Sequence, residues 1–247
     1  MKSKEEIIAI AKQTILIEGE AVNQLNNQLN EDFSDLVSEI INLKGRVIIT
    51  GVGKSAIIAQ KLVATFNSTG TPAIFMHAAD AIHGDLGIIQ KDDLILCLSK
   101  SGNTAEIKVL IPFLKQGNNK IAAIVGDTDS YLAKNSDFIL NASVVKEACP
   151  HNLAPTTSTT AQLVLGDALA ICLLECKSFS STDFAKYHPG GALGKKLYLK
   201  VGDLSSLNQK PEITIHATIK EAILEITKKS IKLNINEDKV IIYMPLY

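Results

Sequence analysis

Short, wholly apolar runs alternate with helical patterns through the middle of the chain, and this alternation limits the fold more than any other feature. The runs are rich in Ile, Val and Leu and fall at residues 46–50, 73–76, 94–98, 121–125 and 138–140. Continuous apolar runs are typical of strands that are buried on both faces of a parallel sheet. Crossovers between such strands are right-handed. The pattern therefore predicts an α/β fold, a three-layer αβα sandwich with a five-stranded, flavodoxin-like parallel sheet.

Helices are predicted between and outside these strands. Apolar residues recur at helical spacing through residues 4–29 and 32–43, and again through residues 54–67 and 104–116. A strongly apolar helix is expected over residues 159–176. Its apolar stretch, residues 161–176, is interrupted by Gln162, Asp167 and Glu175, and we expect that stretch to be too short and too polar to span a bilayer.

The chain is expected to contain one main domain and a short tail. Its 247 residues suffice for one full domain and a remainder. The composition turns from Gly-rich to rich in Lys, Ile and Asn near residue 199, so we predict a domain over residues 1–199 and a tail over residues 200–247. The charged N-terminus lacks the features of a signal peptide, so we expect a cytoplasmic protein that binds no membrane.

Composition excludes some classes of partner. The 25 basic and 26 acidic residues give a net charge of −1, and aromatic residues make up only 5% of the chain. Such a chain offers neither a basic field for nucleic-acid phosphates nor platforms on which bases stack, so we expect no nucleic-acid partner. Four cysteines without a C-x-x-C pattern are predicted to be buried thiols in a reducing cytosol: Cys97, Cys149, Cys172 and Cys176.

The first Gly-rich turn follows the run at 46–50 and reads Gly51-Val-Gly-Lys-Ser-Ala56. A P-loop would need glycine at position 48, where the chain has Ile48. A dinucleotide site would need an acidic residue about 20 positions on, and none occurs before Asp80. Two alternatives remain. The segment could be a tight turn alone, or it could hold a small anion through helix-start amides, Ser55 and Lys54.

The second turn, Ser99-Lys-Ser-Gly-Asn-Thr104, is a stronger signal for phosphate. Ser99, Ser101 and Thr104 surround a glycine between a strand and a helix. A helix cap alone would need only one of these hydroxyls, whereas a phosphate can accept from all of them, from free amides and from the helix dipole. A third hydroxyl-rich run, residues 156–160, either closes the same site or only caps the next helix.

Together these motifs resemble the sugar isomerase (SIS) domain family and, within it, the arabinose-5-phosphate isomerases. The hallmark is the S-x-S-G-x-T sequence at residues 99–104. The resemblance covers residues 5 to about 200. It is carried as well by residues 51–55, 64–72, 83–87, 146–150, 153–160 and 188–194.

The resemblance implies interconversion of D-ribulose 5-phosphate and D-arabinose 5-phosphate, a step that feeds Kdo and lipopolysaccharide synthesis. It also implies a homotetramer, no required cofactor, and zinc only as an inhibitor that involves His77. The family's catalytic positions match Lys54, Glu106, Glu147 and His188 in this chain. Its substrate-contact positions match Gly70, Thr71, His77 and His83.

Aldose–ketose isomerisation needs a base, stabilisation of a developing oxyanion, proton transfer between oxygens, and a grip on the phosphate. We expect a glutamate to be the base that moves the proton between C1 and C2, with Glu147 favoured over Glu106. His188 is expected to open the sugar ring or to carry the proton between O1 and O2. Lys54 is expected to stabilise the enediolate or the phosphate charge.

Other interpretations stay open at this stage. The chain could be a sugar-phosphate sensor without catalysis, or a sibling isomerase for a six- or seven-carbon sugar phosphate. It departs from the family at Asp80 and Asn103, where glutamate is usual or common. In the tail, residues 201–204 and 217–228 resemble only the opening of a CBS module. Such a fragment is expected to pack loosely or in an oligomer contact.

Overall fold

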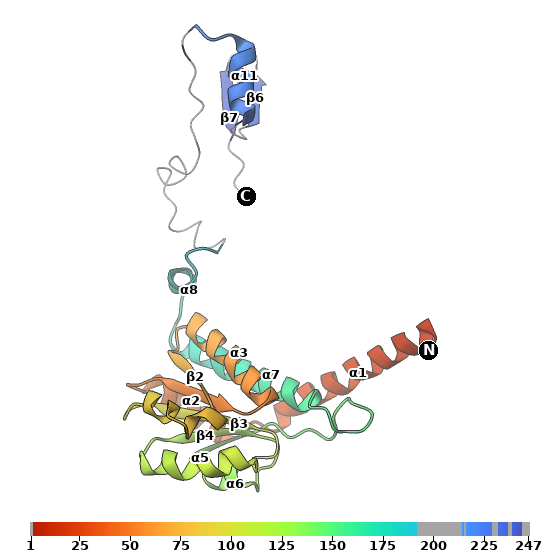
Figure 1. The fold of residues 1–247 in the computed structure, drawn as a ribbon, viewed down its shortest axis with the longest axis vertical. Coiled ribbons are helices and arrows are strands. Elements are labelled where there is room, and N and C mark those ends of the chain that lie inside the picture. The colour runs from red at the N-terminus through yellow and green to blue at the C-terminus, as the bar shows by residue number, and fades with distance from the viewer. Residues whose placement is uncertain (1, 192–213, 215, 229–231, 237–238, 244–247) are drawn as a thin grey trace. The chain divides into compact units, whose positions relative to one another are not determined.

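Five parallel strands form a central sheet in the order β2-β1-β3-β4-β5 (Figure 1). The computed structural model describes residues 2–191, 214, 216–228, 232–236 and 239–243. The chain divides into two compact units, Met1–Tyr187 and His188–Tyr247, and the sheet belongs to the first. The strands are β1 (Val47–Gly51), β2 (Ala73–His77), β3 (Leu94–Ser99), β4 (Ile121–Val125) and β5 (Phe138–Asn141). The predicted flavodoxin-like order is confirmed.

Each central strand is mostly apolar because both of its faces are covered. Val47 and Ile49 of β1 pack into one hydrophobic cluster, whereas Ile48 between them packs into the other. Successive side chains on a strand point to opposite faces, so a strand between two helical layers has no polar face. Strands β1 and β3 are buried along their whole length, which explains why their sequences do not alternate.

One face of the sheet is covered by the helices α2, α3 and α7, and the opposite face by α4, α5 and α6. Figure 1 shows α3 and α7 on one side of the sheet and α5 and α6 on the other. Helix α7 packs closely on α3: a Cβ placed on Gly166 would lie 2.3 Å from a terminal carbon of Leu62. Helix α1 projects beyond the sheet and exposes apolar side chains on its free part. The bounds are α1 (Lys4–Gln24), α2 (Glu31–Ile41), α3 (Lys54–Ser68), α4 (Ala78–Ala81), α5 (Ala105–Gln116), α6 (Tyr131–Lys134) and α7 (Thr157–Cys176).

Helix α7 is the one helix in the described part of the chain that is long and apolar enough to cross a membrane. Its apolar character has another cause, since Leu165, Leu169 and Leu173 are buried in the core against the sheet. On its other side Asp167 forms an ion pair with Lys61 of α3. The helix therefore serves as a core element of the first unit.

The predicted elements are found within a few residues of their expected ends. Three short segments were not predicted from the sequence: α4, the 3₁₀ turn η2 (Asp85–Ile88) and α8 (Ser181–Tyr187). The second unit contains α11 (Ile219–Lys228) and an antiparallel pair, β6 (Lys232–Asn236) and β7 (Lys239–Tyr243). The predicted boundary near residue 199 and the CBS-like residues 201–204 lie outside the described residues.

The prediction that all four cysteines are buried is wrong. Cys97 on β3 is buried, Cys149 and Cys172 are partly buried, and Cys176 is exposed; all four are free thiols. The inward face of α7 is the one that carries Leu173. Cys172 packs at the border of the core, and Cys176 is exposed at the last residue of α7.

Candidate active site

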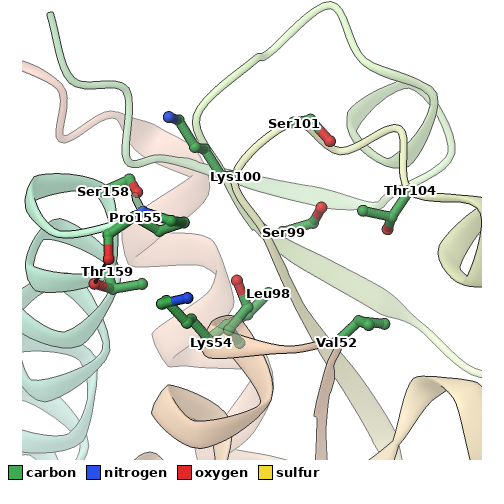
Figure 2. Close-up of a pocket in the computed structure, with 11 residues that line it drawn as sticks. Val52, Lys54, Leu98, Ser99, Lys100, Ser101, Thr104, Pro155, Ser158 and Thr159 are labelled. Carbon is green, nitrogen blue, oxygen red and sulfur yellow. Dashed lines mark hydrogen bonds between the residues drawn. The ribbon is translucent and has the colours of Figure 1, made fainter. Parts of the chain in front are cut away.

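A cavity of about 260 Å³ opens at the carboxyl ends of β1 and β3, between the turns that follow these two strands. Strand order reverses between β1 and β3, and ligands of doubly wound sheets bind at such a switch point. Figure 2 shows Ser99, Ser101 and Thr104 on one side and Pro155, Ser158 and Thr159 on the other, with Lys54 between them. The lining residues are Val52, Lys54, Ser55, Leu98, Ser99, Lys100, Ser101, Thr104, Pro155, Ser158 and Thr159.

The turn after β3 builds one wall of this cavity. The amide of Gly102 donates to Ser99 Oγ at 3.0 Å, and the amide of Asn103 donates to Ser101 Oγ at 3.2 Å. Gly102 has φ +61°, and a Cβ there would lie 2.0 Å from Ser130 Oγ, so only glycine fits. These contacts hold the turn in a single shape at the N-terminus of α5.

Thr104 stands at the N-cap of α5 without capping its helix. Its Oγ1 is buried and has no hydrogen-bond partner among the residues that the structure describes. The first amides of α5 have no carbonyl partner within the helix either. An anion in the cavity would satisfy the free hydroxyl and these amides together.

The turn after β1 builds the floor. Gly53, with φ +58°, precedes α3, and Lys54 and Ser55 are the first two residues of that helix. Ser55 Oγ donates to Oε1 of Gln162, a buried residue of α7, at 3.1 Å. This bond ties the start of α3 to α7 and leaves the exposed Lys54 ammonium at the cavity. The floor therefore adds positive charge and a second helix N-terminus.

The carboxylate of Glu147 lies behind the third wall, the start of α7. It is buried and accepts hydrogen bonds from the amides of Thr156 and Ser158 at 2.9 and 3.1 Å. The hydroxyls of the same two residues donate to it at 3.3 and 2.5 Å. Lys100 Nζ completes the set at 2.6 Å from Oε1. Glu147 thus provides the negative charge that the N-terminus of α7 favours.

This environment makes Glu147 a weak base in the unliganded chain. Burial by itself would raise the pKa of the carboxyl group, because it disfavours the charged form. Hydrogen bonds from Lys100, from the Ser158 hydroxyl and from the two backbone amides outweigh burial and lower the pKa to about 2. A carboxylate held in this way needs a change in its surroundings before it can accept a proton from carbon.

Five of the predicted site residues line the cavity together: Lys54, Ser55, Ser99, Ser101 and Thr104. Glu147 is not a lining residue, but it contacts two residues that are, Lys100 and Ser158. Glu106 is partly exposed in the first turn of α5, near the cavity but not among its lining residues. The hydroxyl-rich run closes the same site, since Ser158 and Thr159 line it.

The histidines occupy different places. His77 ends β2 beside Gly51, at the same edge of the sheet as the cavity, with Nδ1 3.6 Å from an oxygen of Asp80. His83 is exposed in the segment after α4. His188 is the first residue of the second unit, so its part in the site stays a prediction. Within the described residues, no group of three His, Cys, Asp or Glu side chains is arranged to hold a metal ion.

Within one chain, Gly70 and Thr71 lie at the amino-terminal ends of the strands, opposite the ends at which the cavity opens. They precede β2, whereas the cavity lies beyond the ends of β1 and β3, roughly 16 Å away along a five-residue strand. Gly70 packs under the ring of Phe179, and Thr71 is buried and accepts a hydrogen bond from Lys177 at 2.9 Å. A single chain does not bring these two residues to the cavity.

Lys100 is a site residue that was not predicted from the sequence. It lies between two serines that the phosphate pattern singled out, and that position was the available signal. Its side chain turns towards the wall formed by α7 (Figure 2). Pro155, Val52 and Leu98, the other lining residues that were missed, supply apolar surface.

Comparisons with known proteins agree with this geometry. Residues 39–172 match the SIS domain family. The chain is 44% identical over 240 residues to the arabinose 5-phosphate isomerase of Pseudomonas aeruginosa, covering 97% of this chain and 74% of that protein. It is 49% identical over 225 residues to that of Francisella tularensis, covering 90% and 69%.

A solved structure from Escherichia coli CFT073, in complex with arabinose 5-phosphate, is 40% identical to this chain. The two structures superpose with a TM-score of 0.74, covering 76% of this chain and 100% of the other. Sequence and structure thus agree over most of the chain. The chain therefore belongs to the arabinose 5-phosphate isomerases, a family of SIS-domain sugar-phosphate isomerases.

Proposed function

We propose that this chain interconverts D-ribulose 5-phosphate and D-arabinose 5-phosphate through a cis-enediol intermediate. The observation that carries the proposal is the cavity at the switch point, where the starts of α3 and α5 meet beside Lys54. Helix N-termini, short hydroxyls and a lysine form a site for a phosphate dianion. Two relatives that are 44 and 49% identical to this chain are arabinose 5-phosphate isomerases.

The phosphate is held by the turn at residues 99–104. Thr104 Oγ1 has a free donor, and Ser99 and Ser101 already accept from the turn's own amides, so their hydroxyl protons are available for phosphate oxygens. Lys54 adds a cation at the floor. Fixing the phosphate in this way leaves the sugar carbons directed across the cavity.

Proton transfer needs one base near C1 and C2. The base removes the proton from C2 of the aldose, the electron pair forms the C1–C2 double bond as the C1 carbonyl electrons move onto O1, and the base returns a proton, exchangeable with solvent, to C1 to give the ketose. Glu147 is favoured for this role, with Glu106 at the start of α5 as the alternative. His188 moves the proton between O1 and O2, and Lys54 stabilises the enediolate charge.

Several finer statements belong to the same proposal. The protein works in the cytoplasm as a homotetramer, and its product feeds Kdo and lipopolysaccharide synthesis. The exposed apolar side chains of α1 support assembly, because a stripe that includes Ile8 and Ile15 would be covered in an oligomer. His77 and His83 contact the sugar. No cofactor is required, and zinc inhibits through His77.

The proposal is tested by incubating the protein with D-ribulose 5-phosphate in D₂O. Nuclear magnetic resonance then follows the appearance of D-arabinose 5-phosphate and of deuterium at its C2. An enediol pathway predicts product that carries deuterium at C2, because the base exchanges its proton with solvent. Binding of the sugar phosphate without product or exchange would refute the isomerase and favour a sensor.

The two alternative functions are not favoured by the relatives. A non-catalytic sensor or an isomerase for a longer sugar would be expected to be most similar in sequence to proteins of those kinds. The relatives at 42–49% identity are instead named as arabinose 5-phosphate isomerases.

A further inference from the structure

Lys100 connects the phosphate turn to the buried carboxylate of Glu147. It lies in the turn between Ser99 and Ser101, and its Nζ is 2.6 Å from Glu147 Oε1. The two partners differ in burial, since the Lys100 side chain is 45% exposed and the Glu147 side chain is not exposed at all. Lys100 also lines the cavity. One cation is therefore shared between a buried anion and a site built for a second anion.

We propose that Lys100 is a positioning residue that exchanges partners: it holds Glu147 in the empty site and turns to the phosphate when substrate binds. Both anions would lie within reach of one lysine, whose flexible four-carbon side chain can move between them. A phosphate ester carries more negative charge than a carboxylate and is open to solvent on the cavity side.

Glu147 would remain supported after Lys100 leaves. The two amides and two hydroxyls of Thr156 and Ser158 still donate to its oxygens, so the carboxylate is not left without partners. It would lose the contact with the positive charge of Lys100. Fewer interactions then oppose the effect of burial, which raises the pKa of the carboxyl group. The carboxylate therefore becomes a stronger base.

The exchange gives the site a requirement for phosphorylated sugars. A sugar without the phosphate would bind without drawing Lys100 away, and Glu147 would stay in its weakly basic form. This consequence rests on the proposed function, because it assumes that Glu147 is the base. The exchange of partners does not rest on it and can be measured without turnover.

The test measures binding of inorganic phosphate by calorimetry to the full chain and to the variants Glu147→Gln, Lys100→Met and the double variant. In the original protein, phosphate binding must break the Lys100–Glu147 contact. We expect Glu147→Gln to bind phosphate about fivefold more tightly, since coupling between two sites is reciprocal and typically at least this large. Lys100→Met should bind about fivefold more weakly, and the double variant should match it.

Matched variants separate exchange from a general loss of structure. Lys108→Met removes an exposed lysine of α5 outside the cavity and should leave phosphate affinity unchanged. Lys100→Arg keeps the charge and should weaken phosphate binding less than Lys100→Met does. The proposal is overturned if Glu147→Gln binds phosphate no more tightly than the original, or if its effect persists without Lys100. Should Glu147→Gln not fold, an unchanged phosphate affinity in Lys100→Met would overturn the proposal by itself.

The same calorimetry distinguishes this proposal from the proposed function. If the variants show the expected phosphate affinities but the protein does not isomerise ribulose 5-phosphate, the partner exchange is supported and the proposed function is refuted. If the protein isomerises ribulose 5-phosphate but Glu147→Gln does not change phosphate affinity, the proposed function is supported and the partner exchange is refuted.

Discussion

The carboxylate of Glu147 should contribute measurably to folding, and Glu147→Gln is the change that tests it. The ordinary pKa of 4.5 is lowered to about 2 in the folded chain. Each tenfold change in the protonation equilibrium corresponds to about 1.4 kcal/mol. Holding the pKa near 2 therefore stabilises the fold by about 3 kcal/mol at neutral pH.

The sign of the pH dependence follows from the lowered pKa. The stabilising contribution is fully present above pH 4.5 and is lost as the pH falls towards 2, because the unfolded chain then binds the proton first. About 1 kcal/mol of it should be lost by about pH 4. Glutamine has a similar shape but cannot carry the charge, so the variant should lack this dependence.

Urea unfolding at fixed protein concentration measures both effects. We expect Glu147→Gln to lower the free energy of unfolding by about 3 kcal/mol at about pH 7, and its difference from the original protein to shrink by about 1 kcal/mol at about pH 4. Glu175→Gln, at an exposed position of α7, is the control and should change stability by less than about 0.5 kcal/mol. A Glu147→Gln variant as stable as this control at neutral pH would show that the buried charge does not stabilise the fold.

Three further predictions concern a turn, a helix contact and a thiol. Gly102→Ala should weaken inorganic phosphate binding in calorimetry at least about tenfold, because φ +61° and the crowded site distort the turn. Gly166→Ala should lower the melting temperature, with a cost of about 1–3 kcal/mol, because its Cβ meets Leu62. Iodoacetamide should modify Cys149 before Cys97, since backbone amides lower the first pKa and burial raises the second to about 12.

Each of these has a matched comparison. Gly87→Ala, where an added Cβ meets nothing within 4 Å, should leave phosphate affinity unchanged, and an equal loss in both variants would contradict the role of Gly102. Gly19→Ala, open to solvent in α1, should not lower the melting temperature. Modification of Cys97 in the folded protein as fast as Cys149 would contradict the assigned thiol environments.

Most of the fold could be predicted because the signals are local. The runs that became β1 and β3 are apolar throughout since both faces are buried, and this alone separates a parallel sheet from a half-exposed one. The phosphate turn was also predictable, because Ser99, Ser101 and Thr104 lie within six residues. Short segments such as α4 have too few residues to show a period.

The pairing of Lys100 with Glu147 could not be predicted in the same way. The two residues are far apart in the sequence, and only the arrangement of β3 and α7 brings them together. Burial of Glu147 has no local signal either, since it follows the exposed Lys146 in a loop. The position of Thr71 at the far edge of the sheet likewise depends on strand direction, which a motif does not record.

We expect the substrate's phosphate to bind at the switch point, held by the starts of α3 and α5. A crystal structure of this protein with D-arabinose 5-phosphate tests it most directly. We expect the phosphate oxygens within hydrogen-bond distance of Ser101, Thr104 and the first amides of α5. A phosphate bound elsewhere, with the turn at residues 99–104 free of ligand, would contradict the account.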